Sequence, residues 1–241
     1  MATIDFESLY LRARTLEKRI YSDEVVAQLP VVAKDHPHKK EWSIRQLSLD
    51  RLSDHIKKTS APLSILEIGC GNGWLSNKLA VLVNAKVCGI DLNKKEIEQA
   101  KIVFRQNPNV NFIYGNFRSD LDPLARYDII ILAATIQYLK DPASLLSELL
   151  QLLNKNGEIH IMDSPFYSNK ELPIAKKRTK AYYEALGVPE LSPFYHHHSL
   201  AGLSHFSLKF LYRPIRFKTL VKKCFGMIES PFPWIMIKTM K

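Results

Sequence analysis

The middle of the chain alternates short apolar runs with amphipathic stretches. Apolar runs predict strands, and apolar positions spaced three and four residues apart predict helices. The predicted strands are Ser64–Ile68, Lys86–Ile90, Val110–Tyr114, Tyr127–Ala133 and Glu158–Met162. The predicted helices between them are Trp74–Val83, Lys94–Arg105 and Ala143–Leu153. This alternation is typical of a parallel sheet with helices on both faces.

Two helical stretches precede the first predicted strand. Residues 3–29 have apolar positions at helical spacing, and a second amphipathic helix is predicted over Glu41–Lys58. The segment from Pro30 to Pro37 separates them, because proline interrupts a helix. We expect residues 1–60 to form an amino-terminal helical cap.

The alternation ends after the fifth predicted strand. A basic helix is predicted over Lys170–Leu186, followed by a loop rich in proline, tyrosine and histidine. Two late strands, Phe206–Tyr212 and Trp234–Thr239, flank a basic helical piece at Phe217–Phe225. They bring the number of predicted strands to seven, and residues 163–205 form an insert before them.

The most informative motif follows the first predicted strand. That strand carries an acid, Glu67, and leads into Gly69-Cys70-Gly71-Asn72-Gly73, with glycine at every second position. Glycines let the backbone turn sharply and let a ligand lie against it without a Cβ in the way. Asp91 ends the next apolar run, where an acid binds a pair of ribose hydroxyls. The constellation predicts an adenosine-containing cofactor at the carboxyl end of a parallel sheet.

A nicotinamide dinucleotide is the competing cofactor. The dinucleotide-binding motif has glycine or alanine at its third position, where the helix packs closely against the strand. This chain has the larger Leu75 at that position. Glu67 would repel a pyrophosphate, whereas it would attract an ammonium group. The residues therefore favour a cofactor with a cationic group and no phosphates.

These motifs resemble those of class I S-adenosylmethionine-dependent methyltransferases. The run Glu67–Gly73 is similar to the first motif of that family, and Tyr127–Ala133 resembles its fourth-strand motif. The stretch Gln137–Leu139 is similar to the segment at the same place in the type 11 branch of that family. The resemblance covers about residues 62–163.

The resemblance implies a fold and an activity. The fold is α/β, a Rossmann-like, mostly parallel seven-stranded sheet with helices on both faces. Residues 61–241 are the methyltransferase domain, and the insert at 163–205 lies on its substrate side. The implied activity moves a methyl group from S-adenosylmethionine to a small-molecule acceptor, with anionic and lipid-linked acceptors among the candidates. The alternative is a module of the same fold that binds nucleic acid through a basic carboxy-terminal third.

The resemblance also implies roles for individual residues. The loop from Gly69 to Gly73 carries the amino-acid end of S-adenosylmethionine, and Glu67 holds its ammonium. Asp91 takes both ribose hydroxyls, and Leu92 lies against the adenine ring. Strand-end polarity or turn capping would also explain the two acids, but the agreement of the spacings favours the cofactor role for Asp91.

Four further residues complete the implied cofactor site. Asn116 and Phe117 follow the third strand, where the family often has an aspartate near the adenine amino group. Asparagine departs from that pattern, but its carbonyl accepts the same hydrogen bond. Ala133 would offer its backbone carbonyl beside the methionyl group. Arg45 would reach the methionyl carboxylate, with ordinary surface packing as the alternative.

No motif identifies a catalytic residue. A general base is needed only if the acceptor is a hydroxyl or a protonated amine. Tyr138, just past the fourth strand, and His205 are candidates for that base. The three cysteines have no metal-ligand spacing, so we expect no metal site.

Positive charge is concentrated in the last third of the chain. The net charge is +10, yet residues 1–164 hold 21 Lys and Arg against 20 Asp and Glu. Residues 165–241 hold 13 against 4. This basic third suits an anionic substrate, a lipid head-group surface or nucleic acid, and a solvated basic face explains it equally well.

Composition favours a globular protein of the cytoplasm. The hydrophobic content is 46%, and no apolar run approaches the ~18 residues that a membrane span needs. The first ten residues carry acids where a signal peptide has lysine or arginine. An odd number of scattered cysteines is expected in reduced form.

Overall fold

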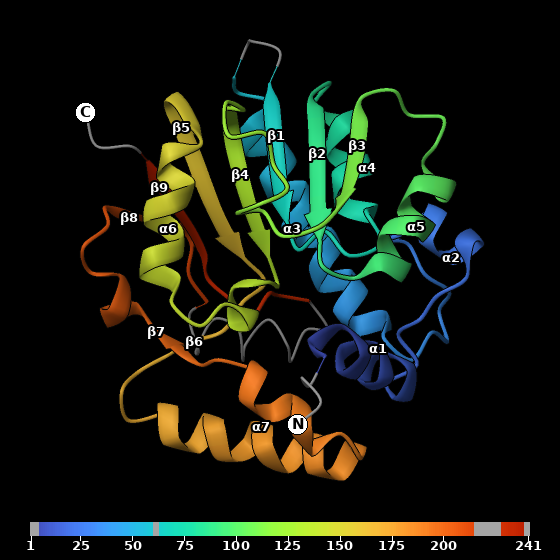
Figure 1. The fold of residues 1–241 in the computed structure, drawn as a ribbon, viewed down its shortest axis with the longest axis vertical. Coiled ribbons are helices and arrows are strands. Elements are labelled where there is room, and N and C mark those ends of the chain that lie inside the picture. The colour runs from blue at the N-terminus through green and yellow to red at the C-terminus, as the bar shows by residue number, and fades with distance from the viewer. Residues whose placement is uncertain (1–4, 60–62, 215–227, 239–241) are drawn as a thin grey trace.

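A seven-stranded sheet forms the centre of the molecule, in the order β3-β2-β1-β4-β5-β9-β8 (Figure 1). The structure is a computed structural model that describes residues 5–59, 63–214 and 228–238. Only β9 runs antiparallel to its neighbours within this sheet. The strands are β1 (Ser64–Ile68), β2 (Lys86–Asp91), β3 (Val110–Tyr114), β4 (Tyr127–Ala133), β5 (Leu153–Met162), β8 (Leu208–Tyr212) and β9 (Trp234–Lys238). The predicted Rossmann-like, mostly parallel sheet is confirmed.

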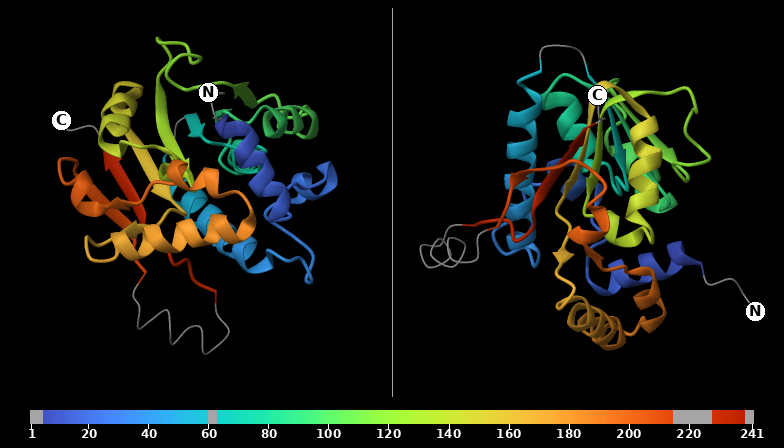
Figure 2. Two further views of the ribbon diagram at one scale, coloured as in Figure 1. Left: turned by 60° about the horizontal axis from the view of Figure 1, so that its bottom comes forward. Right: turned by 90° about the vertical axis from the view of Figure 1, so that its left-hand side faces the viewer.

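Helices cover both faces of this sheet (Figure 2). Successive side chains of a strand point to opposite faces, so Ile65 joins one apolar core and Leu66 joins the other. Both are fully buried, as expected for a parallel sheet between two helical layers. The covering helices are α3 (Lys39–Ile56), α4 (Trp74–Leu82) and α5 (Lys94–Val103) on one face, and α6 (Pro142–Gln151) on the other.

α3 contributes to the main core of the sheet. Its Leu49, Leu52 and Ile56 are at most 2% exposed and belong to the same apolar cluster as Ile65 and Leu79. The predicted division of the chain at residue 60 would separate this helix from the sheet face that it covers. That division stays a prediction.

The predicted helix over residues 3–29 is wrong, because the chain forms two helices there. α1 (Phe6–Leu16) ends where Lys18 takes a left-handed backbone with φ of 57°. The N–H of Arg19 then donates to the carbonyl of Arg14, which is the hydrogen-bond pattern of a helix C-terminal cap. α2 (Asp23–Gln28) starts afresh after this turn.

Other element boundaries differ from the predictions by a few residues. β5 begins at Leu153 and not at Glu158, because Tyr127 pairs with Leu153 across a register shift. The first late strand begins at Leu208 and not at Phe206. The basic helical piece predicted at Phe217–Phe225 lies outside the described residues.

α1 and the insert meet beyond the carboxyl ends of the parallel strands (Figures 1 and 2). A small apolar cluster joins them, with Ala13 from α1 and Tyr183 from the insert at its centre. The short parallel pair of β6 and β7 connects the two ends of the insert. No helix in the described ranges is long and apolar enough to cross a membrane. The remaining elements are η1 (Ile136–Tyr138), β6 (Phe166–Tyr167), α7 (Leu172–Leu186), η2 (Pro189–Phe194), β7 (His198–Ser199) and η3 (Leu200–Leu203).

The glycine loop after β1 is packed tightly against the core at Gly73. Gly73 is the N-cap of α4 with φ of 75°, and a Cβ there would overlap the Phe112 ring and lie 2.9 Å from the Ala100 Cβ. Gly73→Ala should lower the free energy of unfolding by about 2–4 kcal/mol, because backbone strain and overpacking add. Gly187→Ala is the matched control, since φ is 81° there but nothing lies within 4 Å. It should cost only about 1–2 kcal/mol in urea unfolding, and equal losses would contradict the packing argument.

Candidate active site

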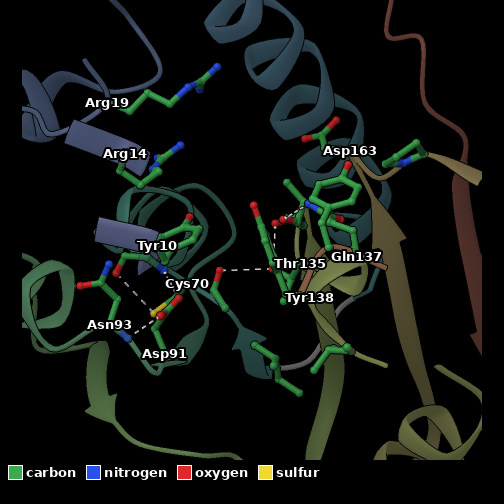
Figure 3. Close-up of a pocket in the computed structure, with 18 of the residues that line it drawn as sticks. Tyr10, Arg14, Arg19, Cys70, Asp91, Asn93, Thr135, Gln137, Tyr138 and Asp163 are labelled. Carbon is green, nitrogen blue, oxygen red and sulfur yellow. Dashed lines mark hydrogen bonds between the residues drawn. The ribbon is translucent and has the colours of Figure 1, made fainter. Parts of the chain in front are cut away.

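A cavity of about 1620 Å³ lies at the carboxyl edge of the sheet, under α1 and the insert (Figure 3). Its walls come from the loops after β1, β2, β3, β4 and β5, together with side chains of α1, α3 and α7. Ligands of open parallel sheets bind at this edge. The volume exceeds that of a typical single-ligand pocket of roughly 300–1,000 Å³, so two ligands can be accommodated side by side.

The structure brings most of the predicted site residues to this cavity. The predicted residues that line it are Arg45, Glu67, Gly69, Cys70, Gly71, Asn72, Asp91, Leu92, Asn116, Phe117, Ala133 and Tyr138. Two predicted residues, both within the described ranges, lie elsewhere. Gly73 faces the core at Phe112, and His205 is an exposed residue outside the cavity. Neither is positioned to contact a ligand there.

The floor of the cavity depends on a close approach between the ends of β1 and β4. Gly69 has φ of 73°, and a Cβ on it would lie 2.5 Å from Oγ1 of Thr135. The Thr135 hydroxyl donates to the Ala133 carbonyl at 3.1 Å. The Gly69 N–H donates to the carbonyl of Ile90 at 2.8 Å. Any larger residue at position 69 would push these strand ends apart.

Asp91 is held in place by two backbone N–H groups. Its Oδ2 accepts from the N–H of Gly71 at 2.8 Å, and its Oδ1 accepts from the N–H of Asn93 at 2.8 Å. Burial raises the pKa of Asp91, although both hydrogen bonds act in the opposite direction. Each carboxylate oxygen keeps a free lone pair, so the group can still accept hydrogen bonds from a ligand.

Glu67 is a buried acid whose charge depends on what lies beside it. The side chain is 3% exposed, and its Oε2 accepts from the Ser76 hydroxyl at 2.5 Å. Burial raises the pKa of Glu67 to about 8, so the group is mostly neutral at pH 7. A carboxyl that is mostly neutral at pH 7 repels phosphates less than the fixed negative charge expected from the sequence. In the structure it ionises readily only beside a cation.

Arg45 lines the cavity but already has an anionic partner. Its Nε and Nη2 donate to the same Glu41 oxygen at 3.2 and 3.1 Å, and Arg19 also donates to that carboxylate. Burial raises the pKa of Glu41, yet the Arg19 hydrogen bond and the nearby Arg45 outweigh burial and bring it to about 2. Arg45 therefore presents a largely neutralised guanidinium to the cavity.

Asn116 and Leu92 lie at the outer edge of the cavity. The Oδ1 of Asn116 accepts from the N–H of Arg118 at 3.0 Å, so this side chain caps its own turn. The second lone pair of that oxygen and the amide NH₂ remain for a ligand. Leu92 is 47% exposed, whereas Phe117 is 8% exposed. Leu92 therefore offers an exposed apolar surface at this edge of the cavity, next to the buried ring of Phe117.

Tyr138 stands at the cavity wall but cannot serve as a base at neutral pH. Its ring packs edge-on against Tyr10 and Tyr195, with centroid distances of 5.5 and 5.7 Å. Burial raises the pKa of Tyr138 well above its usual value of 10, so the phenol keeps its proton. The hydroxyl of Tyr138 already shares a hydrogen bond with Tyr183, so the position of Tyr138 suits contact with an acceptor through its ring.

Sequence reasoning missed a large part of the cavity wall. Its residues come from α1, the ends of β4 and β5, α7 and η2, so no local motif contains them. The spacing of four residues between Tyr10 and Arg14, which places both on one face of α1, is the one available signal. The missed wall residues are Phe6, Tyr10, Arg14, Thr135, Gln137, Asp163, Tyr183, Phe194 and Tyr195.

A cluster of side chains of the types that bind metal ions, two histidines and a glutamate, lies outside the cavity. Nε2 of His55 and Nε2 of His160 lie 2.7 and 3.1 Å from the same oxygen of Glu158. The indole of Trp234, which can only donate, points at Nδ1 of His160 at 3.0 Å. His160 therefore carries its proton on Nε2 and donates it to Glu158, and a metal there would have to displace that proton. With Lys238 at 2.7 Å from the other Glu158 oxygen, the cluster is an ion-pair network joining α3, β5 and β9.

The fold and the cavity define an α/β protein with a cofactor site of the adenosine-binding type. The chain belongs to the family described as "Methyltransferase domain", whose model matches residues 59–207. The resemblance inferred from the sequence motifs is thereby confirmed at the level of the family.

Curated relatives match about half of the chain. A malonyl-[acyl-carrier protein] O-methyltransferase of Ilyobacter polytropus is 33% identical over 111 residues, which are 46% of this chain and 41% of that protein. A ubiquinone biosynthesis O-methyltransferase of Leptothrix cholodnii is 26% identical over 121 residues, 49% of this chain and 51% of that protein. The chain thus spans about half the length of the curated relatives it matches.

Solved structures share the fold over nearly the whole chain. Magnesium protoporphyrin IX methyltransferase from Synechocystis PCC 6803, with bound SAM, has a TM-score of 0.61 at 15% identity and covers 100% of both chains. The plantazolicin methyltransferase BpumL, in complex with a triazolic desmethylPZN analogue and SAH, has a TM-score of 0.57 at 17% identity and covers 98% of both chains. At these identities the likeness shows the fold alone.

The Glu158 network should make the folded state sensitive to acid. Burial raises the pKa of Glu158, but hydrogen bonds from His160, Lys238 and His55 hold it well below its usual value. Stability from this group is present above the unfolded pKa near 4.5 and is lost as the pH falls below it. Glu158→Gln should cost up to about 3 kcal/mol at pH 7, and about 1 kcal/mol less at pH 3.5, in urea unfolding.

Glu98→Gln is the control for this measurement. Glu98 is exposed, and its ion pair with Lys94 is weak because the two charged groups lie 3.9 Å apart in solvent. This substitution should change the free energy of unfolding by under about 0.5 kcal/mol at either pH. A Glu158→Gln loss that is the same at pH 7 and pH 3.5 would contradict the ionic origin of the effect.

Proposed function

We propose that this chain transfers a methyl group from S-adenosylmethionine to a small-molecule acceptor. The observation that carries the proposal is the convergence of Glu67, the Gly69–Asn72 loop and Asp91 on one cavity with room for a second ligand. Membership of the methyltransferase-domain family supports it. The bound cofactor would supply a methyl group already activated by its sulfonium.

Different residues of the cavity would bind different parts of this cofactor. Asp91, fixed by two backbone N–H groups, would accept hydrogen bonds from the ribose hydroxyls. Glu67 would ionise beside the methionyl ammonium, and the Ala133 carbonyl would lie close to the same group. Leu92 and Phe117 would enclose the adenine ring. Arg45 would approach the methionyl carboxylate while it keeps its contact with Glu41.

The insert would provide the acceptor side of the site. Arg178, Thr179 and Tyr183 of α7 line the cavity, so this helix lies over the space beside the proposed cofactor. Such a cover excludes water and aligns the acceptor with the methyl group, which is the main task left to the protein. The names of the curated relatives suggest acceptors carried on a protein or built on a quinone precursor. Binding of nucleic acid to the basic third has no support from these relatives.

Methyl transfer can be tested while the acceptor is still unidentified. The chain is incubated with methyl-labelled S-adenosylmethionine and a cell extract separated into small molecules, protein and nucleic acid. Label should appear in the small-molecule fraction or on a small molecule attached to a carrier protein. Label confined to nucleic acid would favour the alternative function, and no label at all would count against an enzyme.

Asp91→Ala should weaken binding of the demethylated cofactor, S-adenosylhomocysteine, by at least about 100-fold. The variant removes two charge-assisted hydrogen bonds, each worth about 1.5–3 kcal/mol. Calorimetry measures the affinity, and circular dichroism checks the fold. Asp50→Ala is the control, because Asp50 is exposed on α3 and outside the cavity. Unchanged affinity in a folded Asp91→Ala variant would contradict the proposal that Asp91 binds the ribose hydroxyls.

Binding of S-adenosylhomocysteine at pH 7 should release close to one proton from Glu67. With a pKa of about 8, this carboxyl is about 90% protonated at pH 7, and the ligand ammonium would ionise it. Affinity should therefore rise from pH 6 to pH 8 and then level off. Calorimetry in two buffers of different ionisation enthalpy counts the protons. Glu67→Gln should abolish the release, and a wild-type protein that binds without releasing a proton would refute this role.

A further inference from the structure

We infer that the acceptor is a planar aromatic molecule with one carboxylate, seated among the rings of the cavity wall and paired with Arg14. The inference rests on the proposed function, because it assigns the half of the cavity that the cofactor would leave free. Three observations carry it: the aromatic wall, the loosely held Arg14 and a buried amide oxygen without a partner among the described residues.

The part of the cavity wall around Tyr138 is built from aromatic rings of separate elements. Tyr138 of η1 lies at its centre, 5.9 Å from the ring of Phe6 and 5.5 Å from that of Tyr10. Phe194 and Tyr195 extend the wall from η2 and the residue that follows it, at 5.4 Å from Phe6 and 5.7 Å from Tyr138. Edge-to-face and tilted rings at these distances form a surface that favours another ring against it.

Arg14 enters this wall one helical turn after Tyr10. Its guanidinium carbon lies 5.7 Å from the centre of the Tyr10 ring, and both residues line the cavity. Its nearest acid contact is Glu96 at 4.0 Å, the outer limit of an ion pair. The Nε atom is buried and has no hydrogen-bond partner among the described residues. A buried donor left unpaired costs about 1–3 kcal/mol, which a ligand oxygen would recover.

Three other arginines at the cavity are paired with acids, and a fourth, Arg178, is exposed and donates to the Tyr167 hydroxyl at 3.4 Å. Arg19 and Arg45 share Glu41 at 2.6–3.2 Å, and Arg118 donates twice to Glu148 at 2.6 and 3.2 Å. Compared with these three, Arg14 is the arginine that a ligand anion can use at the lowest cost in broken contacts. Its planar edge matches a carboxylate.

The surroundings of Arg14 select a single negative charge. Glu96 is buried beside it, and Asp91 lies close enough to raise the pKa of Glu96 in addition to the effect of burial. These acids would repel a dianion such as a phosphate ester more strongly than a monoanion. One guanidinium balances one carboxylate, so a carboxylate fits the local charge better than a phosphate does.

Gln137 adds a second unsatisfied group to the same cavity. It is 7% exposed, and its amide Nε2 donates to the Ala134 carbonyl at 2.6 Å (Figure 3). Its Oε1 is buried and finds no hydrogen-bond donor within the part of the chain that the structure describes. A hydroxyl or N–H on the acceptor would satisfy it. The acceptor half thus combines apolar ring surface with an open donor and an open acceptor.

The test uses the full chain saturated with S-adenosylhomocysteine and three probes. They are 2-naphthoate, 2-naphthol, which lacks the carboxylate, and cyclohexanecarboxylate, which lacks the aromatic ring. Calorimetry should show 2-naphthoate binding at least about tenfold more tightly than either of the others, because only it uses both the rings and Arg14.

Arg14→Gln should then weaken 2-naphthoate binding about tenfold or more and leave 2-naphthol within about twofold. S-adenosylhomocysteine should lose less affinity than 2-naphthoate, because the Arg14 charge only assists the ionisation of Asp91. Arg12→Gln is the matched control, because Arg12 lies on the same helix and does not line the cavity. It should change none of the affinities.

Two results would overturn the inference. One is that 2-naphthoate binds no more tightly than 2-naphthol to the saturated wild-type protein. The other is that Arg14→Gln weakens S-adenosylhomocysteine and not 2-naphthoate, which would place Arg14 on the cofactor carboxylate. A wild-type chain that fails to bind S-adenosylhomocysteine would instead refute the proposed function, so the two failures are distinguishable.

Discussion

The site depends on close packing of the glycine-loop backbone against side chains of β3 and of the loop after β4. Gly69 lies so near Thr135 that no side chain fits between them, and Gly73 is packed against the Phe112 ring. These contacts set the direction in which the loop leaves the sheet, and through the Gly71 N–H they also orient the Asp91 carboxylate. The floor of the cavity is therefore built by steric exclusion, and its polar groups follow from that geometry.

Buried acids give the empty cavity an unfavourable electrostatic character. Burial raises the pKa of Glu67 to about 8, that of Glu96 to about 7 and that of Asp163 above its usual value. Each of these groups is costly to ionise in the free protein and becomes cheaper to ionise when a cation is nearby. A ligand with an ammonium and a sulfonium group would relieve this cost, so the burial that makes these acids costly to ionise also favours that kind of ligand.

The two halves of the cavity have different origins in the chain. The half proposed for the cofactor comes from loops within the segment that matches the family, residues 59–207. The aromatic wall also uses Phe6, Tyr10 and Arg14 of α1, which lie before that segment. Contact between α1 and the insert, through Ala13 and Tyr183, brings these parts together. If the proposed division holds, changes in α1 and the insert would alter acceptor recognition and leave the half proposed for the cofactor unchanged.

The sequence by itself determined the strands, the parallel sheet and most of the residues in the half of the cavity proposed for the cofactor. These features depend on local patterns: apolar runs, a glycine loop and acids such as Asp91 at strand ends. Its errors were also local, since the left-handed turn at Lys18 divides a helix that periodicity made continuous. Gly73 has the same spacing as the other loop glycines, and only packing against Phe112 shows that it faces the core. The tertiary structure alone decided the acceptor wall and the raised pKa of Glu67, because burial and contacts between distant segments have no signature in neighbouring residues.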